Sequence, residues 1–184
     1  MLNRSNRIVI GSAIVVLFSP FLLPNIMIQP TGSLARGLYL KSELTKKPAA
    51  GNIVSVSFKD KDVSGRSKTY PLPKNMPWKS FLKVIAGIPG DIINVSDDGI
   101  FINGKYWGPV HKVTSKGRSL LKVIDGEYRL KKDWFLTLTP HHMSYDSRYY
   151  GPVHISQLKL ATALFLLPWD NSIKNKRSTN DKRK

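Results

Sequence analysis

The chain has 184 residues, of which 41% are hydrophobic, enough for one folded domain with a real core. It contains no cysteine, so thiol nucleophiles, cysteine-based zinc sites and disulfide frameworks are excluded. The formal net charge of +17 suits an anionic partner, which would be nucleic acid, anionic lipid or an acidic protein surface.

An apolar segment near the N-terminus is the first structural signal. Residues 8–28 carry no charged side chain over 21 positions, and roughly 20 apolar residues suffice to cross a membrane. Two arginines precede the segment and favour a cytoplasmic N-terminus. Pro20 and Pro24 would kink or shorten a helix, and a cleaved signal peptide is the alternative, but no A-x-A type site follows. We therefore expect residues 1–28 to form a cytoplasmic stub and an uncleaved membrane anchor.

Strand and turn patterns dominate the rest of the chain. Alternating apolar positions and short apolar runs predict strands, and the pairs Pro89-Gly90 and Asn103-Gly104 predict turns. The strands are expected at residues 52–58, 81–88, 91–95, 99–102, 105–107, 118–124 and 134–139, with a last strand or an interfacial helix at residues 158–168. The predicted fold is mostly β: an antiparallel domain over residues 29–170, after one N-terminal transmembrane helix.

The last segment, residues 171–184, is strongly basic. Residues 172–184 contain six Lys or Arg side chains against one Asp. Such a run is typical of a solvated, disordered tail, and binding of lipid headgroups is the functional alternative.

Lys83 is unusual because it lies within an apolar run, FLKVIAGI at residues 81–88. Either it lies on the solvent face of an edge strand, or it is buried and its pKa falls. A lysine that starts near pKa 10.4 must lose roughly two to three units to act as a base near neutral pH. A neutral amine of this kind can deprotonate a serine hydroxyl, and Ser33, beside Gly32, is a candidate. The four histidines show no metal-ligand spacing, so surface or packing roles are expected.

Three segments match, in order, the boxes of a known family. The first is TGSLARGLY at residues 31–39, the second is KVIAGIPGD at 83–91, and the third is SYDSRYYG at 144–151. Together they resemble the nucleophile box, the lysine box and the S-x-D-S-R-Y-x-G box of the type I signal peptidase family of Ser-Lys peptidases. The Arg-Gly-Leu-Tyr ending is similar to the conjugative-transfer branch, the TraF-type peptidases. The resemblance covers residues 8 to about 155.

The resemblance implies a role for each matching residue. Ser33 would be the catalytic nucleophile and Lys83 the general base. The hydroxyl of Thr31 and the backbone N–H of Ser33 would form the oxyanion hole, although a local cap is an alternative role for Thr31. Ser144 would hold the amine of Lys83 in line.

Three further residues would support the site. Asp146 and Arg148 would form an ion pair, and the resemblance leaves open whether Asp146 is mainly structural or takes a direct part in aminolysis. Asp91 would brace the turn after Pro89-Gly90. No cofactor and no metal are implied.

The implied function is that of a membrane-anchored serine endopeptidase with a signal-peptidase-like catalytic domain. It would lie in a bacterial inner membrane, in contact with its lipid, with a single span and the catalytic domain in the periplasm. Its substrate would be a pilin precursor for conjugative transfer or type IV secretion, cleaved by hydrolysis or cyclised. The Gly-Asp-Asn preface of cellular signal peptidases is missing before the third box, at residues 138–143, and this favours the TraF branch.

Two alternatives come from other classes. One is a general type I signal peptidase that cleaves the signal peptides of exported proteins. The other is a non-catalytic, basic, membrane-anchored module that binds DNA or lipid, and its only support is the net charge of +17. Nucleic acid is not expected as a substrate of the peptidase.

Overall fold

The computed structural model describes residues 25–58, 80–113, 117, 119–120 and 126–168. These residues form a mostly β structure in which every strand pairing is antiparallel, as the sequence predicts. The elements in chain order are β1 (Ile26–Gln29), β2 (Gly37–Ser42), β3 (Ile53–Ser57), β4 (Ser80–Gly87), β5 (Ile92–Ser96), β6 (Gly99–Ile102), β7 (Lys105–Gly108), β8 (Gly126–Arg129), β9 (Trp134–Leu138), α2 (Ser147–Tyr150), β10 (Val153–His154), the 3-10 helix η2 (Ile155–Gln157) and β11 (Leu158–Leu166).

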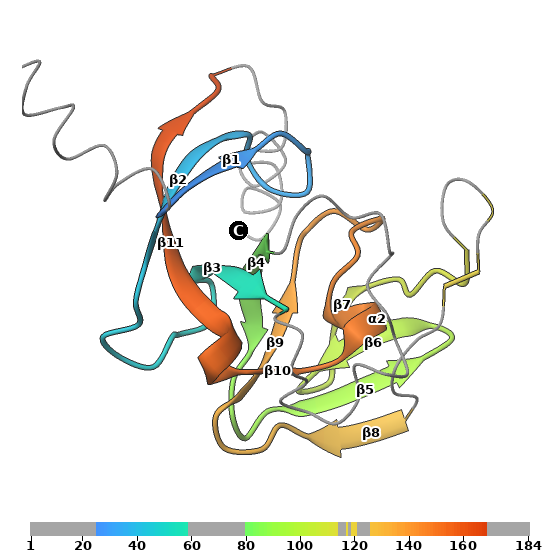
Figure 1. Ribbon diagram of the computed structural model, residues 1–184. Coiled ribbons are helices and arrows are strands. Elements are labelled where there is room, and N and C mark those ends of the chain that lie inside the picture. The colour runs from blue at the N-terminus through green and yellow to red at the C-terminus, as the bar shows by residue number, and fades with distance from the viewer. Residues whose placement is uncertain (1–24, 59–79, 114–116, 118, 121–125, 169–184) are drawn as a thin grey trace, which may run out of the picture.

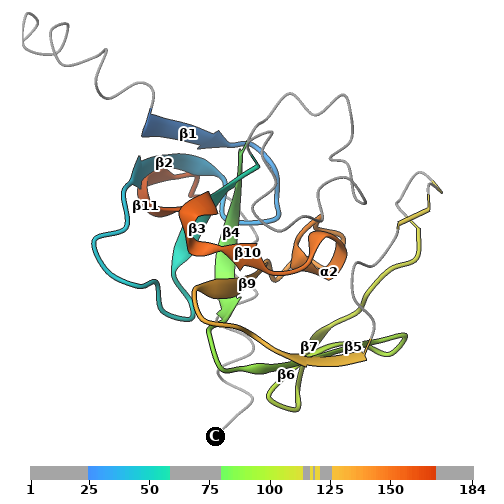
Figure 2. The ribbon, with the colours of Figure 1, turned by 60° about the horizontal axis from the view of Figure 1, so that its bottom comes forward.

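The strands form two sheets (Figures 1 and 2). The larger sheet has the order β1-β2-β11-β3-β4-β9-β10, and the smaller one has the order β7-β6-β5-β8. In the larger sheet β1 and β10 are the edges, and β4 is an interior strand between β3 and β9. Strand β3 pairs with β4 from Ser80 to Val84, and β9 pairs with it from Val84 to Gly87.

Strand β4 is also covered on its two faces. Ile85 packs with Val54 and Val56 of β3 in one apolar cluster. Leu82, which points to the opposite face, packs with Tyr39 of β2 in another. The middle of β4 therefore has apolar packing on both faces, and Leu82, Lys83 and Ile85 are buried there.

Strand β9 joins the cores of the two sheets. Phe135 belongs to the cluster of β3 and β4, whereas Leu136 and Leu138 pack with Ile93 and Ile100 of the smaller sheet. Because successive side chains of a strand alternate between its faces, one strand contributes to both cores. The two sheets are thus packed around a shared element.

The hairpin predicted at Asn103-Gly104 is confirmed. It connects β6 and β7, and both residues have positive φ, 50° for Asn103 and 75° for Gly104. That pair of angles is the requirement of the two-residue turn that matches the twist of an antiparallel hairpin.

The N-terminal boundary differs from the prediction. Residues 26–28, predicted as the end of the membrane anchor, belong to β1, which pairs with β2 from Ile26↔Leu40 to Gln29↔Gly37. The apolar pattern of a short segment cannot by itself distinguish a strand from the end of a helix. The backbone pairing with β2 decides that these residues form a strand. Residues 8–24 of the predicted anchor lie outside the described residues. Within the described part, no helix is long and apolar enough to cross a membrane.

Other differences are local. Strand β2 and the short helix α2 were not predicted. The apolar segment predicted as either a strand or an interfacial helix forms a strand, β11. The predicted strand at residues 118–124 lies largely outside the described residues, as does the basic tail.

Asp91 holds the turn that follows β4. Its Oδ2 accepts a hydrogen bond of 2.8 Å from the backbone N–H of Ile88, and its Oδ1 accepts one of 2.8 Å from Nδ2 of Asn103. Gly90, in between, has φ of +97°, a conformation that favours glycine. The carboxylate therefore links the β4–β5 turn to the β6–β7 hairpin.

We predict that Asp91→Ala lowers the free energy of unfolding by about 1–2 kcal/mol, because two hydrogen bonds to the carboxylate are lost. Urea denaturation measures the change. Asp98→Ala is the matched control, since Asp98 is an exposed aspartate in the turn between β5 and β6, and it should change stability by less than about 0.5 kcal/mol. Equal effects of the two substitutions would show that the Asp91 carboxylate does not brace the turn.

Candidate active site

A cleft with a volume of about 470 Å³ lies between the start of the described chain and strand β4. Its walls come from β1 and the loop after it, from the first half of β4, and from the loop between β9 and α2. The lining residues are Met27, Ile28, Gln29, Pro30, Thr31, Gly32, Ser33, Ser80, Phe81, Leu82, Lys83, His141, Met143, Ser144 and Tyr145. The predicted residues Thr31, Ser33, Lys83 and Ser144 therefore meet in one cleft.

Ser33 lies in the loop between β1 and β2. Its Oγ accepts a hydrogen bond of 3.1 Å from Nε2 of Gln29 and lies 3.2 Å from Oγ1 of Thr31. The next residue, Leu34, is buried in the apolar cluster beneath the loop. The hydroxyl of Tyr39 donates to the carbonyl of Ala35 at 2.8 Å, so the loop is held on the C-terminal side of the serine as well.

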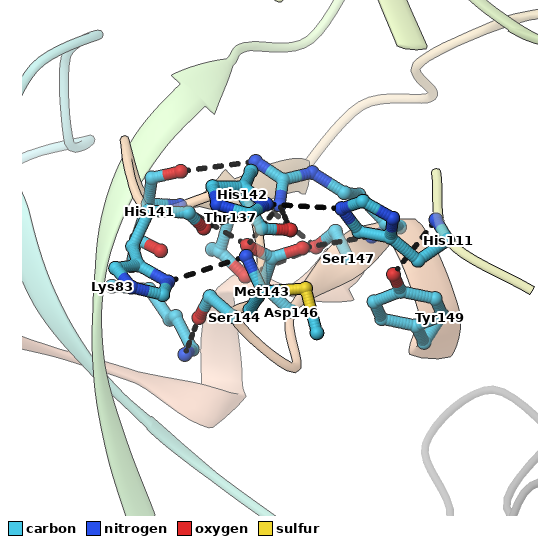
Figure 3. Close-up of polar contacts among 12 residues, drawn as sticks. Lys83, His111, Thr137, His141, His142, Met143, Ser144, Asp146, Ser147 and Tyr149 are labelled. Carbon is cyan, nitrogen blue, oxygen red and sulfur yellow. Dashed lines mark hydrogen bonds and ion pairs between the residues drawn. The ribbon is translucent and has the colours of Figure 1, made fainter. Parts of the chain in front are cut away.

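Lys83 is buried, with only 4% of its surface exposed, although it carries an ionisable amine. It pairs with Val54 of β3, and its Nζ donates a hydrogen bond of 2.9 Å to Oγ of Ser144 (Figure 3). Burial lowers its pKa to about 8; the nearby carboxylate of Asp146 opposes this shift, and the guanidinium of Arg148 adds to it. A substantial fraction of the amine is thus neutral slightly above neutral pH.

Asp146 and Arg148 form a buried ion pair beside Lys83. Nη1 of Arg148 lies 3.7 Å from Oδ2 of Asp146, and both side chains are at most 2% exposed. The carboxylate also accepts from the backbone N–H groups of Thr139 and Arg148, each at 3.2 Å, and so caps α2. Burial raises the pKa of Asp146 to about 6, against the lowering effects of Arg148 and Lys83.

The guanidinium of Arg148 shapes the loop between β9 and α2. It donates to the carbonyl oxygens of Thr139 at 3.0 Å, His141 at 3.3 Å and His142 at 3.0 Å. Because Ser144 follows in the same loop, these bonds fix the backbone that presents the Ser144 hydroxyl to Lys83.

The adjacent histidines His141 and His142 lie in this loop and not on a strand. Their rings are stacked, with centroids 5.4 Å apart, and Nδ1 of His142 is 3.1 Å from Nε2 of His111. In the part of the chain that the structure describes, no group of three or more His, Cys, Asp or Glu side chains is arranged to hold a metal ion.

Two further residues complete the description of the site. Asp91, predicted to brace the turn after Pro89-Gly90, accepts from the backbone N–H of Ile88 in that turn and does not line the cleft. Gln29 was not predicted, yet its amide contacts both Thr31 and Ser33. The sequence did carry a signal for Gln29, because it is a polar residue that follows the apolar run of residues 26–28 and stands four positions before Ser33.

The fold and this cleft define an all-antiparallel β domain with a serine hydroxyl and a buried lysine in one cleft. Comparison with known families agrees, since the family model described as "Signal peptidase, peptidase S26" matches residues 5–167. The chain therefore belongs to the S26 signal peptidase family, which consists of serine peptidases that act on preproteins and are generally associated with membranes.

One solved structure with similarity is the crystal structure of a signal peptidase I from Enterococcus faecalis V583. The two sequences are 20% identical, the match covers 64% of this chain and 98% of that chain, and the TM-score is 0.36. Among curated proteins no match was found.

The lowered pKa of Lys83 predicts a specific dependence of stability on pH. Between pH 8 and 10.5 the unfolded chain binds a proton at Lys83 that the native protein has released, so the free energy of unfolding rises with pH. We predict that wild type gains about 3 kcal/mol relative to Lys83→Met over this window. Denaturant unfolding at a series of pH values measures the free energy of unfolding of each protein. The titration of other groups cancels when the value for Lys83→Met is subtracted from that for wild type. A difference that stays constant with pH would mean that Lys83 keeps an ordinary pKa.

Proposed function

We propose that this protein is a membrane-anchored serine endopeptidase of signal peptidase type in which Ser33 is the nucleophile and Lys83 the general base. The observation that carries the proposal is the burial of Lys83, whose pKa falls to about 8, on the wall of the cleft that also holds Ser33. A neutral amine in that place can accept the hydroxyl proton of a serine. The family membership supports the same reaction class.

The reaction would proceed by acyl transfer. Ser33 Oγ attacks the scissile carbonyl while its proton passes to Nζ of Lys83, which then returns the proton to the leaving amine. The hydroxyl of Thr31 and the backbone N–H of Ser33 would stabilise the oxyanion, and such a donor contributes about 3–4 kcal/mol. The acyl-enzyme ester is resolved by water or by an amine.

In the free protein Ser33 and Lys83 are hydrogen-bonded to other residues, so one side chain would have to move when the substrate binds. Ser33 Oγ bonds to Gln29 and Thr31, and Nζ of Lys83 bonds to Ser144, within the described residues. Rotation of the Ser33 side chain toward Lys83 would then accompany entry of the substrate. Catalytic hydrogen bonds that are long or misaligned without substrate often tighten in the complex.

Three residues would support Lys83 without reacting themselves: Ser144, Asp146 and Arg148. Ser144 accepts from the amine and fixes its direction. Asp146 raises the pKa of Lys83 and Arg148 lowers it, so the ion pair would moderate the effect of burial on the base. Asp91, outside the cleft, would contribute only through the stability of the turn.

The substrate would bind as an extended chain along β1. This strand is an edge of the larger sheet, and all but its first residue line the cleft. An extended peptide can add to such an edge through main-chain hydrogen bonds. Its scissile bond would then lie beside Ser33, in the loop that follows β1.

For the substrate we propose a pilin precursor of a conjugative transfer or type IV secretion apparatus. The support is the segment Arg36-Gly37-Leu38-Tyr39 and the missing Gly-Asp-Asn preface before the third box. Residues 1–25 would supply a stub and the anchor, up to the start of β1, residues 26–170 the periplasmic peptidase domain, and residues 171–184 a basic tail. A general signal peptidase in the inner membrane fits the family membership equally well.

We predict that Ser33→Ala and Lys83→Met each reduce processing of a co-expressed pilin precursor in membranes by at least about 10³-fold. Ser42→Ala and Lys105→Met, at exposed positions outside the cleft, are the matched controls and should process at the wild-type rate. Retained processing by Lys83→Met would place the base elsewhere, and retained processing by Ser33→Ala would refute the proposed function.

The pH dependence of kcat/KM gives an independent check on the base. Because the neutral amine is the active form, the rate should rise with pH and level off above about pH 8. The profile is measured with a fluorogenic peptide that spans the cleavage site. A rate that is already constant from pH 6 upward would exclude Lys83 as the base.

Mass spectrometry of the processed pilin separates the two fates of the acyl-enzyme. A cyclic product arises when the pilin's own amino terminus attacks the ester, and we expect its mass to be one water below that of the open chain. An open chain would establish hydrolysis. Accumulation of many different preproteins in a depletion strain would instead favour the general signal peptidase.

A further inference from the structure

Gln29 is a polar residue in an apolar setting. It is the last residue of β1, follows Ile26, Met27 and Ile28, and is only 8% exposed. A buried primary amide is stable only if its hydrogen-bonding groups find partners. Its partners are therefore informative about its role.

The amide nitrogen of Gln29 has three acceptors within reach. Nε2 lies 2.8 Å from the carbonyl oxygen of Thr31, 2.8 Å from Oγ1 of Thr31 and 3.1 Å from Oγ of Ser33. The nitrogen carries two hydrogens and cannot accept a hydrogen bond, so it shares two donors among three oxygens. In any hydrogen bond between Nε2 of Gln29 and either hydroxyl group, the hydroxyl oxygen is therefore the acceptor.

This arrangement constrains the hydroxyl hydrogens. Neither the Thr31 nor the Ser33 hydroxyl can point its hydrogen at Gln29, because a donor already faces it. The two oxygens are 3.2 Å apart, so one hydroxyl can donate to the other while the second hydrogen stays available. When Thr31 donates to Ser33, the free hydrogen is that of Ser33.

We propose that Gln29 is a positioning residue that directs the hydrogens of Thr31 and Ser33 away from itself and toward the cleft. The inference rests on the proposed function. The Ser33 hydrogen is thereby available for transfer to Lys83, and the Thr31 hydroxyl, once released by rotation of Ser33, is available to the oxyanion. The side chain of Gln29 touches no substrate atom in this scheme and acts through the two hydroxyl groups.

A purely structural role is the competing explanation, since Gln29 also bonds to the backbone carbonyl of Thr31 and so holds the loop. Both roles use the amide donor of Gln29, but they differ in what is lost with it. Loss of a loop brace lowers the stability of the fold, whereas loss of the direction of the hydroxyl hydrogens also lowers the rate per folded molecule. Stability and rate, measured together on variants that change the donor, separate the two roles.

The experiment compares Gln29→Met and Gln29→Glu in the full-length protein in membranes, using the same fluorogenic peptide above pH 8, where Lys83 of the wild type is mostly neutral. Gln29→Met removes the donor, and we expect kcat to fall about tenfold with KM unchanged. Gln29→Glu turns the donor into a charged acceptor that attracts both hydroxyl hydrogens, and we expect kcat to fall about 100-fold. Rates are expressed per folded molecule.

Gln157→Met is the matched control. Gln157 is half-buried and lies outside the cleft, and its side-chain oxygen accepts one local hydrogen bond from the backbone N–H of His154. The substitution removes that bond, and kcat should stay at the wild-type value. Thermal midpoints of the Gln29 variants and the control are measured in parallel, because a structural role would lower the midpoint without lowering the rate per folded molecule.

Three outcomes would overturn the inference. The first is a kcat for Gln29→Met within twofold of wild type. The second is a Gln29→Glu variant more active than Gln29→Met, since a shape-filling role favours the isosteric side chain. The third is a rise in KM with unchanged kcat, which would place Gln29 in contact with the substrate. Ser33→Ala is assayed alongside, so that failure of the inference about Gln29 can be told apart from failure of the proposed function. If Ser33→Ala is inactive, the proposed function stands even when the inference about Gln29 fails.

Discussion

The burial of the Lys83 amine inside an apolar sheet is the constraint on which the rest of the site depends. An ammonium group among Val54, Ile85 and their neighbours is unfavourable, and the protein resolves this partly by a lower pKa and partly by one hydrogen bond to Ser144. The burial follows from the place of Lys83 in the sheet, since it pairs with β3 on an interior strand and its amine meets Ser144 of the loop after β9.

The loop between β9 and α2 supplies the polar surroundings that this lysine needs. Arg148 satisfies three backbone carbonyls there, and Asp146 satisfies two backbone N–H groups, so most of the cost of burying both charges is offset locally. Within the described residues, Nε of Arg148 and Oγ1 of Thr139 are the buried side-chain atoms without a partner. A network with so few free groups holds one arrangement, and the Ser144 hydroxyl is presented to the amine as a result.

The cleft depends on the curvature of the larger sheet (Figures 1 and 2). In strand order β1 and β4 are separated by β2, β11 and β3, yet residues of both line the same cleft. The serine loop, which follows the edge strand, thus faces an interior strand of its own sheet. The pairing of β2 with β11, whose register shifts between Ala163 and Phe165, lies in the part of the sheet that curves.

Local sequence determined much of this protein. Alternation and turn residues predicted β3 to β7 and β9, since these patterns report on neighbouring positions only. The resemblance of three motifs indicated the family and four of the residues that line the cleft: Thr31, Ser33, Lys83 and Ser144. The tertiary structure decided what depends on distant partners: residues 26–29 form a strand because β2 pairs with them. Lys83 is buried where β3 pairs with it and the loop after β9 brings Ser144 to its amine, and Gln29 reaches Ser33 because the loop folds back. Burial, pKa and hydrogen-bond partners are set by segments that no local pattern brings together.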